Sequence, residues 1–457
     1  MSVLSKSVVI NQSTTTGHQR PDTDPPTTNS PTIKRAWILW FFAALFYAYQ
    51  FLLRVSPGVM SDELVQVYAI DATQLGLLTS FYYYAYVGMQ LPLGIIIDKM
   101  GSERIIAFAA LLLGGASVLF ALAPNIVIAS IARFLMGGCS ACGWIGCVIL
   151  TTRWFSPQQK GLIISLTMGL GTLGAMLGGM PLEVFISYVG WRKALEILSL
   201  VGLLIGVILY LVVYSIPAHL FPLNKISLNK IRRKTAQAPS HSTSQSTWNN
   251  LKTIMKKPQC WIVPAHAMLM WLPIAIIGDQ WGVSFLERYY QLDEGMAATF
   301  IACLFIGVSI GGPFFVLLAH KLSSYKIPLF MGAILCCSLY SIIVFVPGIP
   351  FIVLYILFFL AGVCFTSQLL CFSIVTDSTP SSISGTTMAF TNMIIMISGI
   401  IGLPAIGWIL DWSAGSTGSL GMEGYSADDF RTAFTFIPIC MILAGCLVFK
   451  IRDTYPK

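Results

Sequence analysis

The sequence predicts an all-α membrane protein whose twelve transmembrane helices form two six-helix bundles. Three observations predict this fold. Only 10% of the 457 residues are charged and 56% are hydrophobic, whereas soluble domains carry about 25% charged residues. Apolar runs of 18 or more residues recur along the chain, and each can cross a hydrocarbon core of about 30 Å. One long polar segment, 216–258, divides these runs six and six.

Each apolar run is predicted to be one membrane-spanning helix. In chain order the twelve runs cover 36–58, 73–98, 105–123, 126–151, 161–187, 193–215, 259–283, 296–319, 328–346, 350–375, 384–410 and 432–450. Residues 1–33 are rich in Ser, Thr and Pro and are predicted to form a disordered cytoplasmic tail. No apolar signal-peptide region with a cleavage site precedes the first run, so we expect that run to be retained as a helix.

The polar segment 216–258 is predicted to be a linker between an N-terminal bundle over 34–215 and a C-terminal bundle over 259–451. Its low-complexity part, Pro239 to Thr247, is expected to be flexible. A short tail, 452–457, ends the chain.

Basic residues predict the orientation in the membrane. The linker carries eight Lys and Arg and no acid, and the other loops on its side are also basic. Because positively charged loops stay in the cytoplasm, we expect both termini to be cytoplasmic in a multi-pass protein of the cell (inner) membrane. The net charge of +8 is then a matter of topology, and no nucleic-acid partner is expected.

The cysteines predict neither a metal site nor a disulfide framework. All eleven lie in the apolar runs. Cys139-Ser-Ala-Cys142 has no second pair and no histidine nearby, so these residues are expected to pack helices. No nucleophile elbow, P-loop or His-Glu-x-x-His pattern occurs. We therefore expect no enzyme, no cofactor and no metal.

A charged loop with two glycines joins the second and third runs, Gly94-Ile-Ile-Ile-Asp98-Lys99-Met-Gly101-Ser-Glu103-Arg104. Glycine permits a tight turn and close backbone approach. The stretch resembles the signature G-x-x-x-D-[RK]-x-G-x-R-[RK] between helices 2 and 3 of the major facilitator superfamily. Glu103 departs from it, because a basic residue is usual there. The resemblance implies a cytoplasmic gate made by Gly94, Asp98, Gly101 and Arg104.

Other stretches resemble the same superfamily at matching runs: Arg133 to Gly138, Arg153 to Gly161, and Gly190-Trp191-Arg192. The loop His320 to Lys326 occupies the place equivalent to the 94–104 loop, but it lacks the Asp and the glycines and reads as a degraded copy. The resemblance covers about 36–450. It implies a secondary transporter whose two bundles rock about a midplane site for a small molecule.

Charged side chains inside a membrane are costly, so each one is a functional hypothesis. Arg54 can bind carboxylate or phosphate through its guanidinium. Its surroundings resemble helix 1 of organophosphate:phosphate antiporters, where an Arg in that position binds the anion. Those antiporters use a second Arg in helix 7; here Ala275 stands near that position, which favours a monoanion such as a carboxylate. The alternative is an Arg with a structural pairing or a surface position.

Asp279 lies at a similar depth in the other bundle. It is predicted to bind the ammonium of a zwitterion or to carry a proton, and the alternative is a helix-end acid facing solvent. The resemblance implies that Arg133 binds substrate or couples protons, but pairing with Glu183 is equally open. Glu183 and His266 are further proton-coupling candidates, although a lone His is more often a satisfied core residue.

Three polar residues inside the runs are predicted to line the cavity: Tyr86, Gln368 and Asn392. Taken together, these features predict a monomeric importer of a small carboxylate-bearing metabolite, first of all an amino acid, by proton symport through alternating access. The text from Phe51 to Met60 also resembles the phagosomal transporters of intracellular bacteria, which import amino acids and nucleosides. The alternatives are an organic anion, sugar-phosphate or nucleoside transporter, drug efflux, and a non-transporting receptor.

Overall fold

The computed structural model describes residues 31–215, 243–380, 383–415 and 422–455. Most of the predicted N-terminal tail and the linker residues 216–242 lie outside the described residues. Within them the regular elements are helices. The first helix begins at Pro31, so the predicted tail boundary at residue 33 is slightly too late.

The first six predicted spans form the N bundle. Its elements are α1 (Pro31–Val55), the 3₁₀ turn η1 (Ser56–Val59), α2 (Ser61–Tyr68), α3 (Ala72–Met100), α4 (Ser102–Ala121), α5 (Ile126–Ser140), α6 (Cys142–Trp154), α7 (Pro157–Leu177), α8 (Met180–Val189) and α9 (Trp191–Tyr214). The fourth and fifth spans are each divided between two helices, because the helix is interrupted briefly after Ser140 and after Leu177.

The other six spans form the C bundle. Its elements are α12 (Gln259–Pro273), the π-helix η4 (Ile274–Trp281), α13 (Gly282–Tyr290), α14 (Glu294–Leu322), α15 (Lys326–Phe345), α16 (Phe351–Phe365), the 3₁₀ turn η5 (Thr366–Leu369), α17 (Leu370–Asp377), α18 (Ser384–Ala414), η8 (Met422–Gly424), α19 (Ala427–Phe434) and α20 (Phe436–Lys450). All twelve predicted spans are therefore helical.

Length and apolar composition support the membrane assignment. Among the described residues, eleven helical stretches are long and apolar enough to cross a bilayer. The remaining predicted span is α3, which is 29 residues long. Its Thr, Gln and Tyr residues make it less apolar than its neighbours. Some of these residues form the polar contacts described below.

The part of the linker nearest the C bundle is helical, which corrects the prediction of a flexible segment up to Thr247. Helix α11 covers Thr243–Met255. Its Leu251 and Ile254 are buried against Ile383 and Phe390 at the start of the eleventh span. Burial of this apolar face stabilises a helix that its polar composition does not predict.

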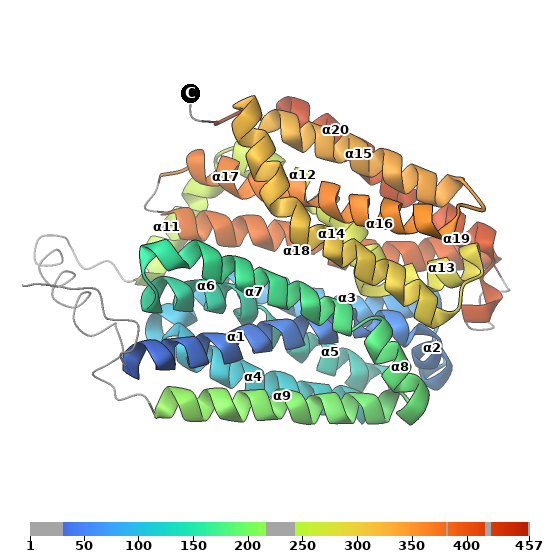
Figure 1. Ribbon diagram of the computed structural model, residues 1–457, viewed down its shortest axis with the longest axis horizontal. Coiled ribbons are helices and arrows are strands. Elements are labelled where there is room, and N and C mark those ends of the chain that lie inside the picture. The colour runs from blue at the N-terminus through green and yellow to red at the C-terminus, as the bar shows by residue number, and fades with distance from the viewer. Residues whose placement is uncertain (1–30, 216–242, 381–382, 416–421, 456–457) are drawn as a thin grey trace, which may run out of the picture.

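The two bundles lie side by side with their helices running along the same long direction (Figure 1). One end of the molecule holds the start of α1, the end of α9, helix α11 and the C-terminus; we call it the linker end. The opposite end holds α2, α8, α13 and α19, and we call it the distal end.

The bundles touch most closely along α3 and α18 near the distal end. A Cβ atom on Gly76 would lie 2.5 Å from the carbonyl oxygen of Leu403, and one on Gly407 would lie 2.2 Å from that of Ala72. Only glycine permits such a close approach of two helix backbones. Asp411 also accepts hydrogen bonds from the backbone N–H of Thr73 (2.8 Å) and from the Thr73 hydroxyl. We call this contact the α3–α18 seam.

Further polar contacts join the bundles at the distal end. The Gln280 amide donates to the Ser61 hydroxyl at 2.9 Å. Arg288 forms an ion pair with Asp62 at 3.7 Å. The structure is therefore a state in which the distal end is closed.

The last residues of the chain complete the degraded loop of the C bundle. The Asp453 carboxylate accepts hydrogen bonds from the Ser324 hydroxyl and from the backbone N–H groups of Tyr325 (3.1 Å) and Lys326 (3.4 Å). Helix α15 has no side-chain cap from its own N-cap residue, Tyr325. Asp453 thus acts as the helix N-cap, and it supplies the acid that the His320–Lys326 loop lacks.

We expect Asp453→Ala to lower the free energy of unfolding of the protein by about 1 kcal/mol at neutral pH, the usual cost of losing an N-cap. Burial alone would raise the pKa of Asp453, but the hydrogen bonds outweigh it and lower the pKa below the ordinary value. A lowered carboxyl pKa stabilises the fold above its unfolded pKa of about 3.9, and this contribution is lost as the pH falls through the folded-state pKa. Thermal unfolding in detergent measures both effects.

The control for this prediction is Asp428→Ala, because the Asp428 side chain is 77% exposed. That variant is expected to unfold like the wild type at neutral pH. Equal unfolding temperatures for Asp453→Ala and the wild type at neutral pH would contradict the capping role.

Candidate functional site

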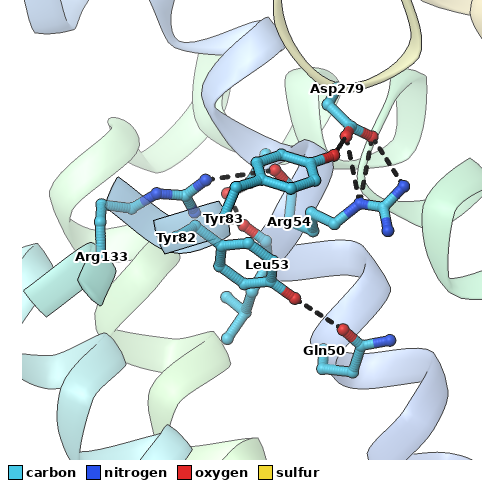
Figure 2. A network of polar contacts seen from close by, with 8 residues as sticks. Gln50, Leu53, Arg54, Tyr82, Tyr83, Arg133 and Asp279 are labelled. Carbon is cyan, nitrogen blue, oxygen red and sulfur yellow. Dashed lines mark hydrogen bonds and ion pairs between the residues drawn. The ribbon is translucent and has the colours of Figure 1, made fainter. Parts of the chain in front are cut away.

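Arg54 and Asp279 form an ion pair between the two bundles. The Arg54 Nε lies 3.1 Å from Asp279 Oδ2, and its Nε and Nη2 both donate to Oδ1 at 3.2 Å. The residues are only 4% and 3% exposed. Figure 2 shows the carboxylate lying against the edge of the guanidinium. The pair is therefore buried in the protein, and neither residue faces solvent. The other alternative for Arg54, a structural pairing, stays open.

Irregular helix geometry presents both side chains. Arg54 lies in the last turn of α1, directly before the 3₁₀ turn η1. Asp279 lies in the π-helix η4, which follows Pro273. Proline has no N–H to donate to the preceding turn, and π-helical segments are rare and often mark functional sites.

Three aromatic rings surround the Arg54 guanidinium. Its Cζ lies 4.6 Å from the ring centroid of Phe51, 5.5 Å from that of Trp271 and 5.8 Å from that of Tyr83. Cation–π contacts occupy the faces of a guanidinium. Its N–H edge, where Asp279 now lies, remains the place at which an anion can bind.

Tyr83 is the residue of this site that sequence analysis missed. Its hydroxyl donates a hydrogen bond to Asp279 Oδ2 (Figure 2). The prediction selected Tyr86, one turn further along α3. Tyrosine is compatible with core, cavity and lipid surface alike, so the run of tyrosines at 82–84 gave no signal for which of them faces the ion pair.

Arg133 is buried beside the pair and bonds to the backbone of α1. Its Nη1 donates to the carbonyl oxygen of Leu53 at 2.9 Å, and its Nη2 to that of Arg54 at 3.4 Å (Figure 2). Its guanidinium also lies 5.1 Å from the ring centroid of Tyr82. Arg133 thus satisfies carbonyls at the end of α1 that the helix leaves free.

The pairing of Arg133 with Glu183, which the sequence left open, is not among the contacts of the described residues. The helix of the fifth span is interrupted after α7. Glu183 lies in the following helix, α8, near the start of α14. There a Cβ on Gly295 would lie 3.1 Å from its Oε2. Glu183 therefore belongs to the distal surface between the two bundles.

The other predicted residues are dispersed. Tyr86 stacks on Tyr82 with ring centroids 6.1 Å apart and interacts with the Asn392 side chain across the bundles. Gln368 is buried in η5, and its Oε1 has no protein partner. His266 is fully buried, with Nδ1 2.9 Å from the carbonyl oxygen of Ala444 on α20. His266 thus fits a satisfied core residue at Nδ1, although its Nε2 has no partner.

The predicted gate is only partly described. Gly94 lies within α3, and the Asp98 side chain is not among the side chains that the structure describes. Gly101 has φ +86° between α3 and α4, as a tight turn requires, and Arg104 is exposed. Glu103, the departure from the signature, is 2% exposed and accepts a hydrogen bond from Trp154 Nε1 at 2.8 Å. It ties the start of α4 to the end of α6.

Comparison with known proteins decides the family. A family model described as Major Facilitator Superfamily matches residues 36–403. The chain belongs to this superfamily. It is a multi-pass membrane protein and a secondary transporter, not an enzyme. Among the described residues, no group of three or more His, Cys, Asp or Glu is placed to hold a metal ion.

The similar curated proteins are transporters. The chain is 23% identical to the probable galactarate/D-glucarate transporter of Bacillus subtilis, over 87% of this chain and 91% of that protein. It is 23% identical to a probable hexose phosphate transport protein of Chlamydia pneumoniae, over 63% of this chain and 64% of that protein.

Among solved structures, the fold is similar to a bacterial homologue of the human lysosomal transporter Spinster in an inward-facing, unoccupied conformation. The TM-score is 0.72 at 15% identity, covering 91% of this chain and 96% of that one. The nucleoside transporter NupG gives a TM-score of 0.67 at 16% identity, covering 90% of this chain and 99% of that one. These likenesses concern the fold.

Proposed function

We propose that this transporter imports a small carboxylate-bearing metabolite by proton symport, with Arg54 as the anion site and Asp279 as the proton site. The observation that carries this proposal is the buried Arg54–Asp279 pair between the bundles. A substrate carboxylate and Asp279 would compete for the same N–H edge of the guanidinium. Protonation of Asp279 removes the competing charge, so substrate and proton would bind together.

The balance of buried charge supports an anionic substrate. Arg54, Arg133 and Asp279 are 4%, 1% and 3% exposed. Two guanidiniums and one carboxylate leave one positive charge in excess, and the carbonyl partners of Arg133 do not neutralise it. An uncompensated charge in a low-dielectric interior is costly. A bound anion would relieve this cost, and protonation of Asp279 would strengthen the preference.

The names of the relatives support the same substrate class. Galactarate, D-glucarate and hexose phosphate are organic anions, and sulfoacetate, named for a further relative, is another. An amino acid is the second candidate, because Asp279 could receive an ammonium group next to a carboxylate on Arg54. An amino-acid substrate would require its ammonium group to bind between Arg54 and Asp279, which bond to each other in this structure.

The proposed orientation and an inward proton gradient together give the direction of import. We assign the linker end to the cytoplasm because it carries the basic loops. The distal end would then face the outside of the cell membrane, and the structure would be a state closed to the outside. The protein would act as a monomer, with proton and substrate entering when the distal end opens.

The test is uptake by purified protein in liposomes, with labelled mono- and dicarboxylates, amino acids, nucleosides and sugar phosphates. A pH gradient, acid outside, is imposed or omitted. We expect accumulation of a carboxylate that grows about tenfold per pH unit of gradient, the limit for one proton. Exchange of a sugar phosphate that is indifferent to pH, or uptake of an uncharged nucleoside alone, would contradict the proposal.

A further inference from the structure

Tyr83 joins α3 to two elements of the C bundle, η4 and α18, from which α3 must separate when the distal end opens. It belongs to α3 of the N bundle and is 1% exposed. Its hydroxyl bonds to Asp279 on η4 of the C bundle. It is thus the second contact, beside Arg54, between the N bundle and this carboxylate.

The ring of Tyr83 lies in the α3–α18 seam. A Cβ on Gly399 of α18 would lie 2.4 Å from ring carbon Cδ2. Any side chain larger than glycine at position 399 would therefore displace the ring. Gly399 lies two turns before Gly407 on the same helix, so ring and backbone contacts belong to one continuous interface.

The strength of the Tyr83 hydrogen bond depends on the charge of Asp279. A phenol donating to a carboxylate makes a charge-assisted bond, which is roughly twice as strong as a bond between neutral groups. Once the carboxyl is protonated, the hydroxyl loses this advantage. The titratable groups around Asp279 are Arg54 from α1, Tyr83 from α3 and Arg133 from α5. Of these, Tyr83 alone also packs into the seam.

We propose that Tyr83 is a positioning residue that transmits the charge of Asp279 to the α3–α18 seam. While Asp279 is ionised, the hydroxyl holds α3 against the C bundle. When the distal end opens, this bond breaks and Asp279 binds a proton from the outside more readily, so that proton binding and the opening of the seam favour each other. This inference rests on the proposed proton site at Asp279.

The test uses full-length protein in liposomes and the carboxylate found in the uptake screen. Tyr83→Phe removes only the hydroxyl and keeps the ring packed against Gly399. We expect its accumulation under an inward proton gradient to fall about tenfold further than its counterflow at equal pH does, because counterflow does not depend on proton-driven opening. Its pH profile of uptake should flatten. Tyr84→Phe is the matched control, because Tyr84 is 41% exposed.

The inference is overturned if Tyr83→Phe keeps wild-type accumulation, or if accumulation and counterflow fall equally, as in a merely structural role. If Tyr83→Phe does not fold, Gly399→Ala displaces the same ring and should show the same selective loss. Asp279→Asn is measured in parallel. Proton-driven accumulation retained in Asp279→Asn would refute the proposed function itself, whereas its loss there and retention in Tyr83→Phe would refute only this inference.

Discussion

Replacement of either member of the Arg54–Asp279 pair is expected to destabilise the protein by about 3–5 kcal/mol, because the other charge is left buried and unpaired. In Asp279→Leu the guanidinium lies among Phe51, Tyr83 and Trp271 without its carboxylate. In Arg54→Met the carboxylate retains only the Tyr83 hydroxyl. Thermal unfolding in detergent measures both losses.

The double variant Arg54→Met/Asp279→Leu is expected to regain most of this stability, because a buried ion pair can be replaced by apolar side chains at little cost. It should nevertheless bind no anion and show no uptake. The double variant would thus be stable but inactive, and the mutant cycle would distinguish the effect of the pair on stability from its effect on transport.

Two results would contradict this interpretation. A double variant as unstable as the singles would mean that the residues do not compensate each other. Uptake by any variant without Arg54 would mean that the anion binds elsewhere. Arg54→Lys is the informative partial change, since it keeps the charge but loses the planar fork, and about a hundredfold loss of affinity is expected.

Sequence reasoning located Arg54 and Asp279 because a charge within an apolar run is conspicuous and costly. Their direct contact could not be predicted, because it depends on the rotation of α1 and on the π-helical turn in η4. A π-helix differs from an α-helix by one residue of register, and no pattern of apolar residues marks it. The depth of the two residues along their helices was therefore predictable, and their mutual orientation was not.

The partners of Arg133 illustrate a different limit. Sequence comparison can only suggest partners that have distinctive side chains, so it suggested Glu183. The actual acceptors are backbone carbonyls of Leu53 and Arg54, which every residue possesses. The same limit applies to the C-terminus, where Asp453 replaces an acid missing from a loop about 130 residues earlier in the chain. Composition is enough to predict the twelve helices. It does not predict that a residue of one element supplies a hydrogen-bond partner missing from another.

Gly76→Ala is expected to reduce uptake on the order of 5- to 150-fold, because it prevents closure of the distal end. The added Cβ would lie 2.5 Å from the Leu403 carbonyl oxygen and 2.9 Å from the Cα of Pro404, both backbone atoms that cannot rotate away. Overpacking of this kind costs about 1–3 kcal/mol. Since the contact exists only when the bundles meet, this cost falls on the closed state and shifts the equilibrium toward the open one.

Gly88→Ala provides the matched control on the same helix, because nothing lies within 4 Å of a Cβ at that position. It tests the effect of an added methyl group on α3 without the seam. Labelling of a Ser61→Cys reporter by a membrane-impermeant thiol reagent follows opening directly, since Ser61 is 4% exposed in the closed structure. Faster labelling with Gly76→Ala, but not with Gly88→Ala, is the expected result. Equal labelling and equal uptake in both would show that the α3–α18 seam is not the barrier at the distal end.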